Sequence, residues 1–205
     1  MDIYLIVLQI SVLLFSVTIH EVSHGLMAEK LGDETAKKAG RLTLNPIKHL
    51  DLIGSFLVPL ALFLLKTGFI IGWAKPVPIN PWNLRDKKYG EAKVAIAGPL
   101  SNLIIALFFG LILRFVHLPY PWFGAVSAVF MMIILINLVL AVFNLTPLPP
   151  FDGSHILFVF LGSKAREAQI FLTRYSFALL FLYVFFIFPL ISPIVSFLFT
   201  LITGI

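Results

Sequence analysis

Four long stretches of this 205-residue chain contain no charged side chain: residues 3–19, 94–113, 118–151 and 175–205. Runs of about 20 apolar residues match the hydrocarbon thickness of a lipid bilayer. Because lipid offers the peptide groups no hydrogen-bond partner, a chain that crosses it must satisfy them internally, as a helix does. The sequence therefore predicts an all-α polytopic membrane protein with about five transmembrane helices.

Composition supports this class. The chain is 60% hydrophobic and 12% charged, whereas about a quarter of the residues in a soluble domain are charged. We expect one membrane-embedded domain over 1–205, with the lipid bilayer and not a nucleic acid as its surroundings, and we attribute the net charge of +5 to loops at the membrane surface. The absence of cysteine excludes disulfides and thiolate metal ligands.

The basic residues predict how the chain is oriented. Lysine and arginine gather in 28–50, 66–93 and 164–174, whereas 114–121 holds only Arg114. Because basic loops of membrane proteins lie mostly on the cytoplasmic side, we expect the first three segments inside the cell and 114–121 outside. A multi-pass protein of the cell membrane follows, with its N-terminus outside.

Two consecutive cytoplasmic loops mean that the segment between them does not cross the membrane. As a helix, 50–65 would be only about 24 Å long, so we expect a re-entrant helix or β-hairpin element, although the sequence leaves open whether 50–72 spans or re-enters. Such a backbone must be shielded by protein or water. Proline excludes a helix over 72–81, and we expect short strands at about 40–46 and 72–79.

The first apolar stretch runs directly into His20-Glu21-Val22-Ser23-His24. Residues four apart lie one above the other on a helix, so both imidazoles can bind one ion. The glutamate between them can act as general base for a metal-activated water. Such residues are unfavourable in a transmembrane run and are functional there by default. The alternative is a helix end at the membrane interface.

Two histidines leave a catalytic zinc ion one protein ligand short. Among the remaining histidines, His117 falls in the predicted outer loop, and His49 falls in a basic loop where an interfacial role is the commoner one. His155 is expected at the surface, with a role beside a ligand as the alternative.

Asp152 is the better candidate for the third ligand. It ends an apolar, proline-rich stretch in which an unpaired acid would be costly. The helix expected over 121–145 runs from outside to inside, as does the first helix, so Asp152 and both histidines reach the cytoplasmic side. Asp152 could instead, or also, cap the helix that begins at Gly153.

Together these motifs resemble the site-2 protease family of intramembrane zinc metalloproteases, in its compact form without a PDZ or CBS domain. The resemblance covers nearly the whole chain. It is carried by five segments, with Phe151 where the family often has leucine: His20-Glu21-x-x-His24, Gly40 to Pro46, Gly72 to Pro78, Ala97-Gly98-Pro99-Leu100-Ser101-Asn102, and Asn144 to Gly153.

The resemblance implies one Zn²⁺ per chain with His20, His24 and Asp152 as ligands and Glu21 as the catalytic base. It also implies that Asn144 lies near the substrate carbonyl. Asn102 is a further candidate for substrate binding, with hydrogen bonding between helices as the alternative.

The function expected from the sequence is hydrolysis of peptide bonds in or near a transmembrane segment of another protein, at a site open to the cytoplasm. Two alternatives stay open: a membrane zinc transporter and a non-proteolytic binder of membrane proteins. A regulatory partner is possible, and the sequence identifies neither it nor the substrate.

Overall fold

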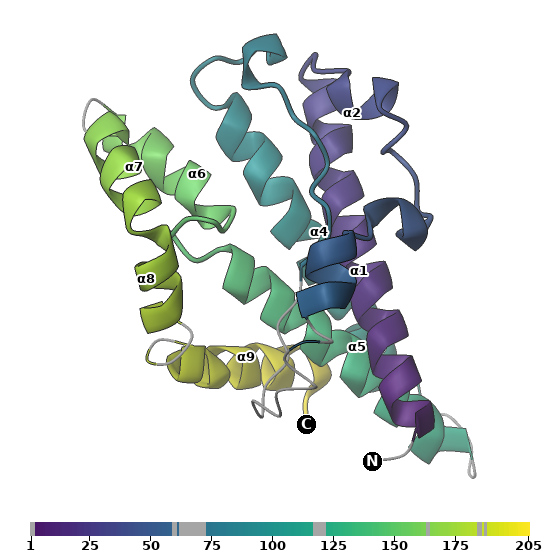
Figure 1. Cartoon of the computed structure of the whole chain (residues 1–205). Coiled ribbons are helices and arrows are strands. Elements are labelled where there is room, and N and C mark those ends of the chain that lie inside the picture. The colour runs from purple at the N-terminus through teal and green to yellow at the C-terminus, as the bar shows by residue number, and fades with distance from the viewer. Residues whose placement is uncertain are drawn as a thin grey trace.

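The computed structural model describes residues 3–58, 61, 73–116, 122–162, 165–183, 186 and 188–205. Within these ranges every regular element is a helix (Figure 1). Three of them are long and apolar enough to cross a membrane. These are α1 (Ile3–Lys30), α4 (Gly90–Phe115) and α5 (Trp122–Asn144). At 28, 26 and 23 residues they are about 42, 39 and 35 Å long, against a hydrocarbon core of about 30 Å.

Helix α4 is the centre of the bundle, since it packs against α1, α5, α6 (Gly153–Leu161) and α9 (Phe188–Thr203). Its buried face consists largely of small residues. These include Ala95, Ala97, Gly98, Ala106 and Gly110. Small residues let helix backbones approach closely, which is how helices associate where lipid supplies no hydrophobic driving force.

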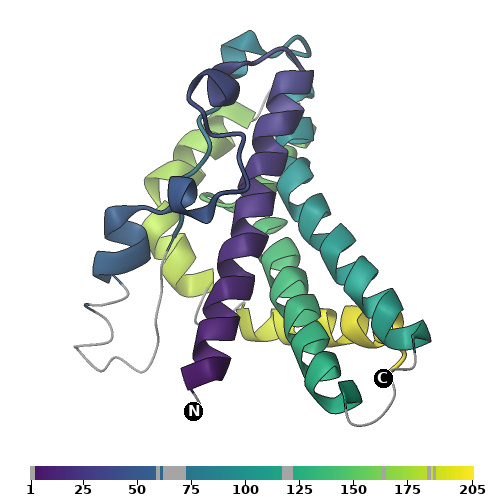
Figure 2. The same ribbon diagram turned by 90° about the vertical axis from the view of Figure 1, so that its right-hand side faces the viewer.

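Among the described residues, the C-terminal part of the chain contains no further helix long enough to count as a membrane span. It forms α7 (Ala165–Arg174), α8 (Ser176–Leu182) and α9. Both Figure 1 and Figure 2 show α9 lying across the bundle, near the N-terminal end of α1. Five transmembrane helices are therefore not confirmed, because in the described residues the late apolar stretch is divided among shorter helices.

The bundle has one main hydrophobic core, where α4, α5 and α9 meet the chain around Phe151 and Tyr183. Its buried members are Ala106, Ile134, Leu138, Phe151, Tyr183, Ile191 and Val195. The rings of Phe143, Phe151 and Tyr183 pack together with centroids 4.3–5.5 Å apart. This packing fixes the loop that follows α5.

Short helices lie around the C-terminal half of α1, some at the end of the bundle where α1 finishes and others lower, beside the middle of the bundle (Figures 1 and 2). They are α2 (Thr35–Lys38), the 3₁₀ helices η1 (Pro46–His49) and η3 (Pro81–Asn83), and the π-helix η2 (Leu52–Leu57). The Asp51 carboxylate accepts hydrogen bonds from the first amides of η2. Most of the predicted re-entrant element over 50–72 lies outside the described residues, so it stays a prediction.

The predicted strands are not confirmed: residues 41–45 and 73–79 form no strand. Residues 73–80, which we call the strap, run extended, but Pro76 and Pro78 remove two amide donors from any ladder. The remaining bonds go elsewhere. Lys75 N–H donates to the His49 carbonyl at 2.8 Å, and the buried Arg41 guanidinium donates to the Lys75 carbonyl at 2.8 Å.

Asp33 ties the strap to the loop after α1. This fully buried carboxylate accepts the Asn80 backbone N–H at 2.6 Å, the Asn83 side-chain amide at 2.9 Å and the Thr35 N–H at 3.1 Å. Burial alone would raise the pKa of Asp33, but the hydrogen bonds from Thr35, Asn83 and Asn80 outweigh it and lower that pKa below 3.8.

The Asp33→Asn variant should therefore be less stable by about 1–3 kcal/mol, because an amide NH₂ would face one of these donors. A lowered pKa stabilises the fold above the unfolded value and stops doing so as pH falls through the folded value. The deficit should thus be full above about pH 4 and shrink below it. Thermal unfolding in detergent across this pH range is the measurement.

Glu34→Gln is the matched control, since Glu34 forms only an exposed ion pair with Lys38. Such pairs contribute at most about 1 kcal/mol. An Asp33→Asn deficit that stays constant down to pH 3 would contradict the assigned role of the ionised carboxylate.

Candidate metal centre and active site

His20 and His24 lie one turn apart on α1 and face α4, where both side chains are buried. Their Nε2 atoms are 3.0 Å apart, and the two rings meet edge to face. Because both histidines belong to an apolar helix and are buried against α4, their imidazoles lie among side chains and not in bulk water. The four-residue spacing thus produces the shared face that was predicted from it.

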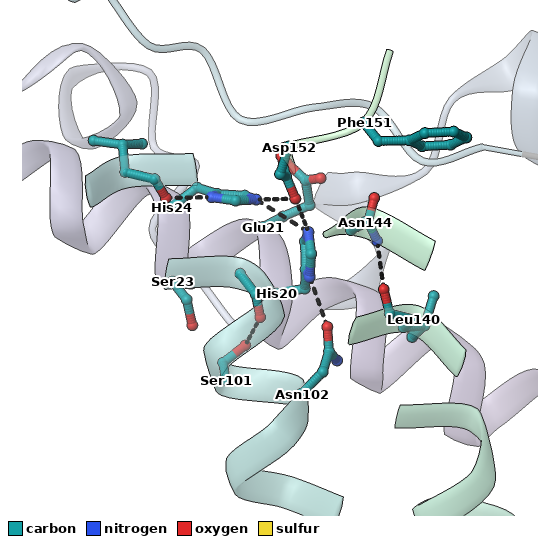
Figure 3. A network of polar contacts seen from close by, with 12 residues as sticks. His20, Glu21, Ser23, His24, Ser101, Asn102, Leu140, Asn144, Phe151 and Asp152 are labelled. Atoms are coloured by element: carbon teal, nitrogen blue, oxygen red, sulfur yellow. Dashed lines mark hydrogen bonds and ion pairs between the residues drawn. The ribbon is translucent and has the colours of Figure 1, made fainter. Parts of the chain in front are cut away.

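Asp152 reaches the same point from the loop between α5 and α6. Its Oδ2 lies 3.1 Å from His20 Nε2 and 3.3 Å from His24 Nε2. Figure 3 shows the three side chains converging, with Phe151 turned away from them. The Phe151 ring packs against Phe143 and Tyr183. Because Phe151 is buried in the core, the neighbouring aspartate is directed to the histidines. Within the described residues this is the only group of three or more potential metal-binding side chains of this kind.

The outer nitrogens of both rings are occupied. His24 Nδ1 lies 2.7 Å from the Val94 carbonyl oxygen, and His20 Nδ1 lies 2.6 Å from Asn102 Oδ1. A carbonyl oxygen only accepts hydrogen bonds, so both Nδ1 atoms carry the proton when the rings are neutral. Each Nε2 then presents a lone pair to the other and to the carboxylate of Asp152.

Three acceptors that face one another at 3.0–3.3 Å need a positive charge between them. The arrangement suits zinc, whose tetrahedral ligands at about 2.0–2.2 Å lie roughly 3.3 Å from each other. A histidine that binds zinc is usually neutral: one ring nitrogen binds the metal, and the N–H of the other ring nitrogen donates to a carbonyl or carboxylate. The residues present therefore fit a three-ligand site of the catalytic type, which leaves a fourth position open.

Gly98 allows α4 to approach the two rings. A Cβ at this position would overlap His24 Nε2 and would lie 2.6 Å from His20 Nε2. Glycine is required here by space and not by backbone conformation. The sequence marked this glycine only as part of the Ala97-to-Asn102 segment, and its neighbours across the interface between α1 and α4 are His20 and His24.

Glu21 lies beside the centre on a cavity of about 390 Å³, and its Oε2 accepts the Val77 backbone N–H of the strap at 2.8 Å. The strap thus forms one wall of the cavity and holds the carboxylate. The lining is mixed polar and apolar. It consists of His20, Glu21, His24, Pro76, Val77, Ile79, Pro81, Glu91, Val94, Ala95, Asn144, Pro150, Asp152 and His155.

The two asparagines have different surroundings. Asn144 lines the cavity, and its Nδ2 donates to the Leu140 carbonyl at 3.0 Å (Figure 3). Asn102 is fully buried and is not part of the cavity lining. Its Oδ1 accepts from His20, so its position suits orientation of that ring better than contact with a substrate.

The other histidines are separate from the three-residue group. His155 is half exposed, lines the cavity, and lies 3.4 Å from the Glu91 carboxylate on α4. The sequence indicated a surface histidine there, with a role beside a ligand as the alternative, and nothing local predicted that α4 would lie beside it. His49 is buried and bonds the Thr43 carbonyl at 2.9 Å, and His117 lies outside the described residues.

Several known proteins are similar to this chain in sequence. The family description "Peptidase family M50", the site-2 proteases, matches residues 118–183, which include Asp152. "Putative zinc metalloprotease YwhC" of Bacillus subtilis is 43% identical over 164 residues, which are 77% of this chain and 71% of that protein. The chain belongs to peptidase family M50. As a member, it is a membrane metalloprotease that uses zinc.

More distant relatives carry similar names. "Putative zinc metalloprotease Rip2" of Mycobacterium tuberculosis is 29% identical over 87% of this chain and 66% of its own length. "Zinc metalloprotease MJ0392" of Methanocaldococcus jannaschii is 36% identical over 43% of this chain and 25% of its own length. No solved structure matches the chain. The resemblance to the site-2 protease family noted from the sequence is confirmed.

The Gly98→Ala variant should lose zinc, because the added methyl group overlaps both Nε2 atoms and forces α4 or the rings to move. We expect at least a hundredfold weaker zinc binding, measured on purified protein by chelator competition. Gly124→Ala on α5 is the matched control, since nothing lies within 4 Å of its added Cβ. Equal zinc binding by the two variants would contradict this geometry.

Proposed function

We propose that this single-domain chain, over 1–205, hydrolyses peptide bonds in or near transmembrane segments of other proteins, with one zinc ion held by His20, His24 and Asp152. The observation that carries the proposal is the convergence of two unprotonated imidazole nitrogens and a carboxylate oxygen beside Glu21. This convergence occurs beside α1, α4 and α5, which are apolar enough to cross a bilayer.

A zinc ion bound there would polarise the substrate carbonyl and lower the pKa of water towards about 7. Glu21 is the general base: it takes a proton from the attacking water and passes it to the leaving amine. The Val77 N–H donates to one Glu21 carboxylate oxygen, so the other oxygen is available to accept the proton of the attacking water. Asn144 lines the same cavity, and its second amide hydrogen is suited to the substrate carbonyl.

The active site faces the cytoplasm in this proposal, and the N-terminus lies outside. The metal centre lies in the C-terminal half of α1, towards the basic segment 28–50 that the positive-inside rule assigns to the cytoplasm. The cavity beside it has a partly polar lining, along which water can reach the site. Its wall, the strap, belongs to the second basic loop.

A helical substrate hides its carbonyls in its own hydrogen bonds, so it must be locally unwound before hydrolysis. Strand addition to the strap is one way to hold such a segment. The amides of Lys75, Val77 and Asn80 already donate to protein acceptors, and Pro76 and Pro78 have none. An unwound substrate would therefore meet mainly carbonyl groups along the strap, and we propose that it donates its own N–H groups to them.

The Glu21→Gln variant should keep its zinc and lose cleavage, because the amide cannot take the proton. A loss of at least about a hundredfold is expected from removing a general base. The test uses purified protein in lipid, a panel of transmembrane substrates, and parallel measurement of bound zinc. Asp152→Ala should differ by losing the zinc as well.

Two outcomes would contradict the proposal. Cleavage by Glu21→Gln at the wild-type rate would exclude Glu21 as the general base. Zinc bound by both proteins with no cleavage of any substrate would favour the alternatives, and zinc transport by both in liposomes would identify a transporter.

The Val77→Pro variant should weaken catalysis without removing zinc, because it deletes the N–H that orients Glu21. We expect cleavage to fall about tenfold to a hundredfold. Val77→Ala keeps the N–H and is the control. If the two variants cleave alike, the backbone bond has no part in positioning the base.

A further inference from the structure

Polar side chains from three helices lie buried beneath His20, on the side of the ring away from Asp152. Figure 3 shows Asn102 in this place. Behind it lie Asn137 of α5 and Ser16 of α1, which are 0% and 4% exposed. None of the three lines the cavity, so they can act on a substrate only through another residue.

The hydrogen bonds between these side chains run in one direction. Asn137 Nδ2 lies 2.9 Å from the Ile133 carbonyl oxygen and 2.9 Å from Ser16 Oγ. A backbone carbonyl only accepts, so this amide must turn its NH₂ towards Ile133. Its Oδ1 is then directed to Asn102, whose Nδ2 donates to it at 2.8 Å.

The orientation of Asn102 follows from that of Asn137. With its Nδ2 committed to Asn137 and, at 3.4 Å, to the Ser16 carbonyl, Asn102 has only Oδ1 left for the imidazole. That oxygen lies 2.6 Å from His20 Nδ1 and can only accept. The proton of a neutral His20 is therefore held on Nδ1.

We propose that Asn137 is a positioning residue for the metal centre: through Asn102 it keeps the proton of His20 on Nδ1 and the lone pair on Nε2. The proposal rests on the assignment of His20 as a zinc ligand. Without Asn137 the Asn102 amide can turn and present its NH₂ to Nδ1, which places the imidazole proton on Nε2. In that tautomer Nε2 cannot bind a metal.

His24 provides an internal comparison, because its tautomer is fixed in one step by the Val94 carbonyl at 2.7 Å. A change at position 137 should therefore alter His20 and leave His24 as it is. If the asparagines only join helices through hydrogen bonds, their removal should lower stability and leave both tautomers unchanged.

The experiment compares Asn137→Leu, Asn137→Asp and Asn102→Leu with wild type in detergent micelles. The control is Thr18→Val, which changes a buried α1 hydroxyl bonded only to the Leu14 carbonyl of its own helix. Imidazole ¹⁵N NMR of the zinc-free protein, at a pH where the rings are neutral, reports each tautomer. Chelator competition reports zinc affinity, and neither measurement needs a substrate.

We expect the Nδ1–H form of both histidines in wild type and Thr18→Val. Asn102→Leu should bind zinc tenfold to a hundredfold more weakly, as usual for the loss of a ligand's hydrogen-bond partner, and Asn137→Leu about tenfold more weakly. In both, the Nε2–H form of His20 alone should rise. Asn137→Asp keeps an acceptor for the Asn102 amide and should restore the wild-type result.

Two results would overturn the proposal. One is a wild-type His20 that carries its proton on Nε2, which needs no variant and so is independent of folding defects. The other is an Asn137→Leu protein with the tautomers and zinc affinity of Thr18→Val. Failure of the proposed peptidase activity is separate, since it would appear as absent cleavage by a protein with normal zinc binding and tautomers.

Discussion

The structure depends on one electrostatic constraint: three hydrogen-bond acceptors are held together in an apolar helix bundle. Their mutual repulsion is tolerated only with a cation among them, and each is held from outside by the fold. The Val94 carbonyl holds His24, Asn102 holds His20, and the packing of Phe151 directs Asp152. The membership of family M50, whose relatives are named zinc metalloproteases, agrees with zinc as that cation.

The sequence predicts much of this arrangement because its strongest signals are local. The apolar stretches indicate α1, α4 and α5, and the spacing of His20 and His24 needs only a helix to bring them together. Asp152 lies 128 residues beyond His24 in the sequence. It could be named because unpaired acids are rare in apolar segments, because loop charge placed both ends on one side, and because the resemblance to the site-2 proteases implies it. The structure brings it to within 3.3 Å of both rings.

Other features depend on tertiary contacts that no local pattern encodes. Short strands were expected at about 40–46 and 72–79, but the strap bonds to side chains and carbonyls around it. Asn137 carried no signal at all, because a single asparagine in an apolar helix does not indicate its partner. The arrangement of the C-terminal helices likewise depends on tertiary contacts, since α9 packs against α4 and α5, whereas α7 packs against α6 and α8.

The bond from the Val77 amide to Glu21 has a consequence for how such a cavity can vary. A backbone N–H is present with any side chain except proline, so the residue at 77 can change in size or polarity while the Glu21 carboxylate stays held. The buried Val77 side chain also forms part of the cavity wall. Substrate preference at this wall can therefore drift, or be engineered, independently of the catalytic geometry.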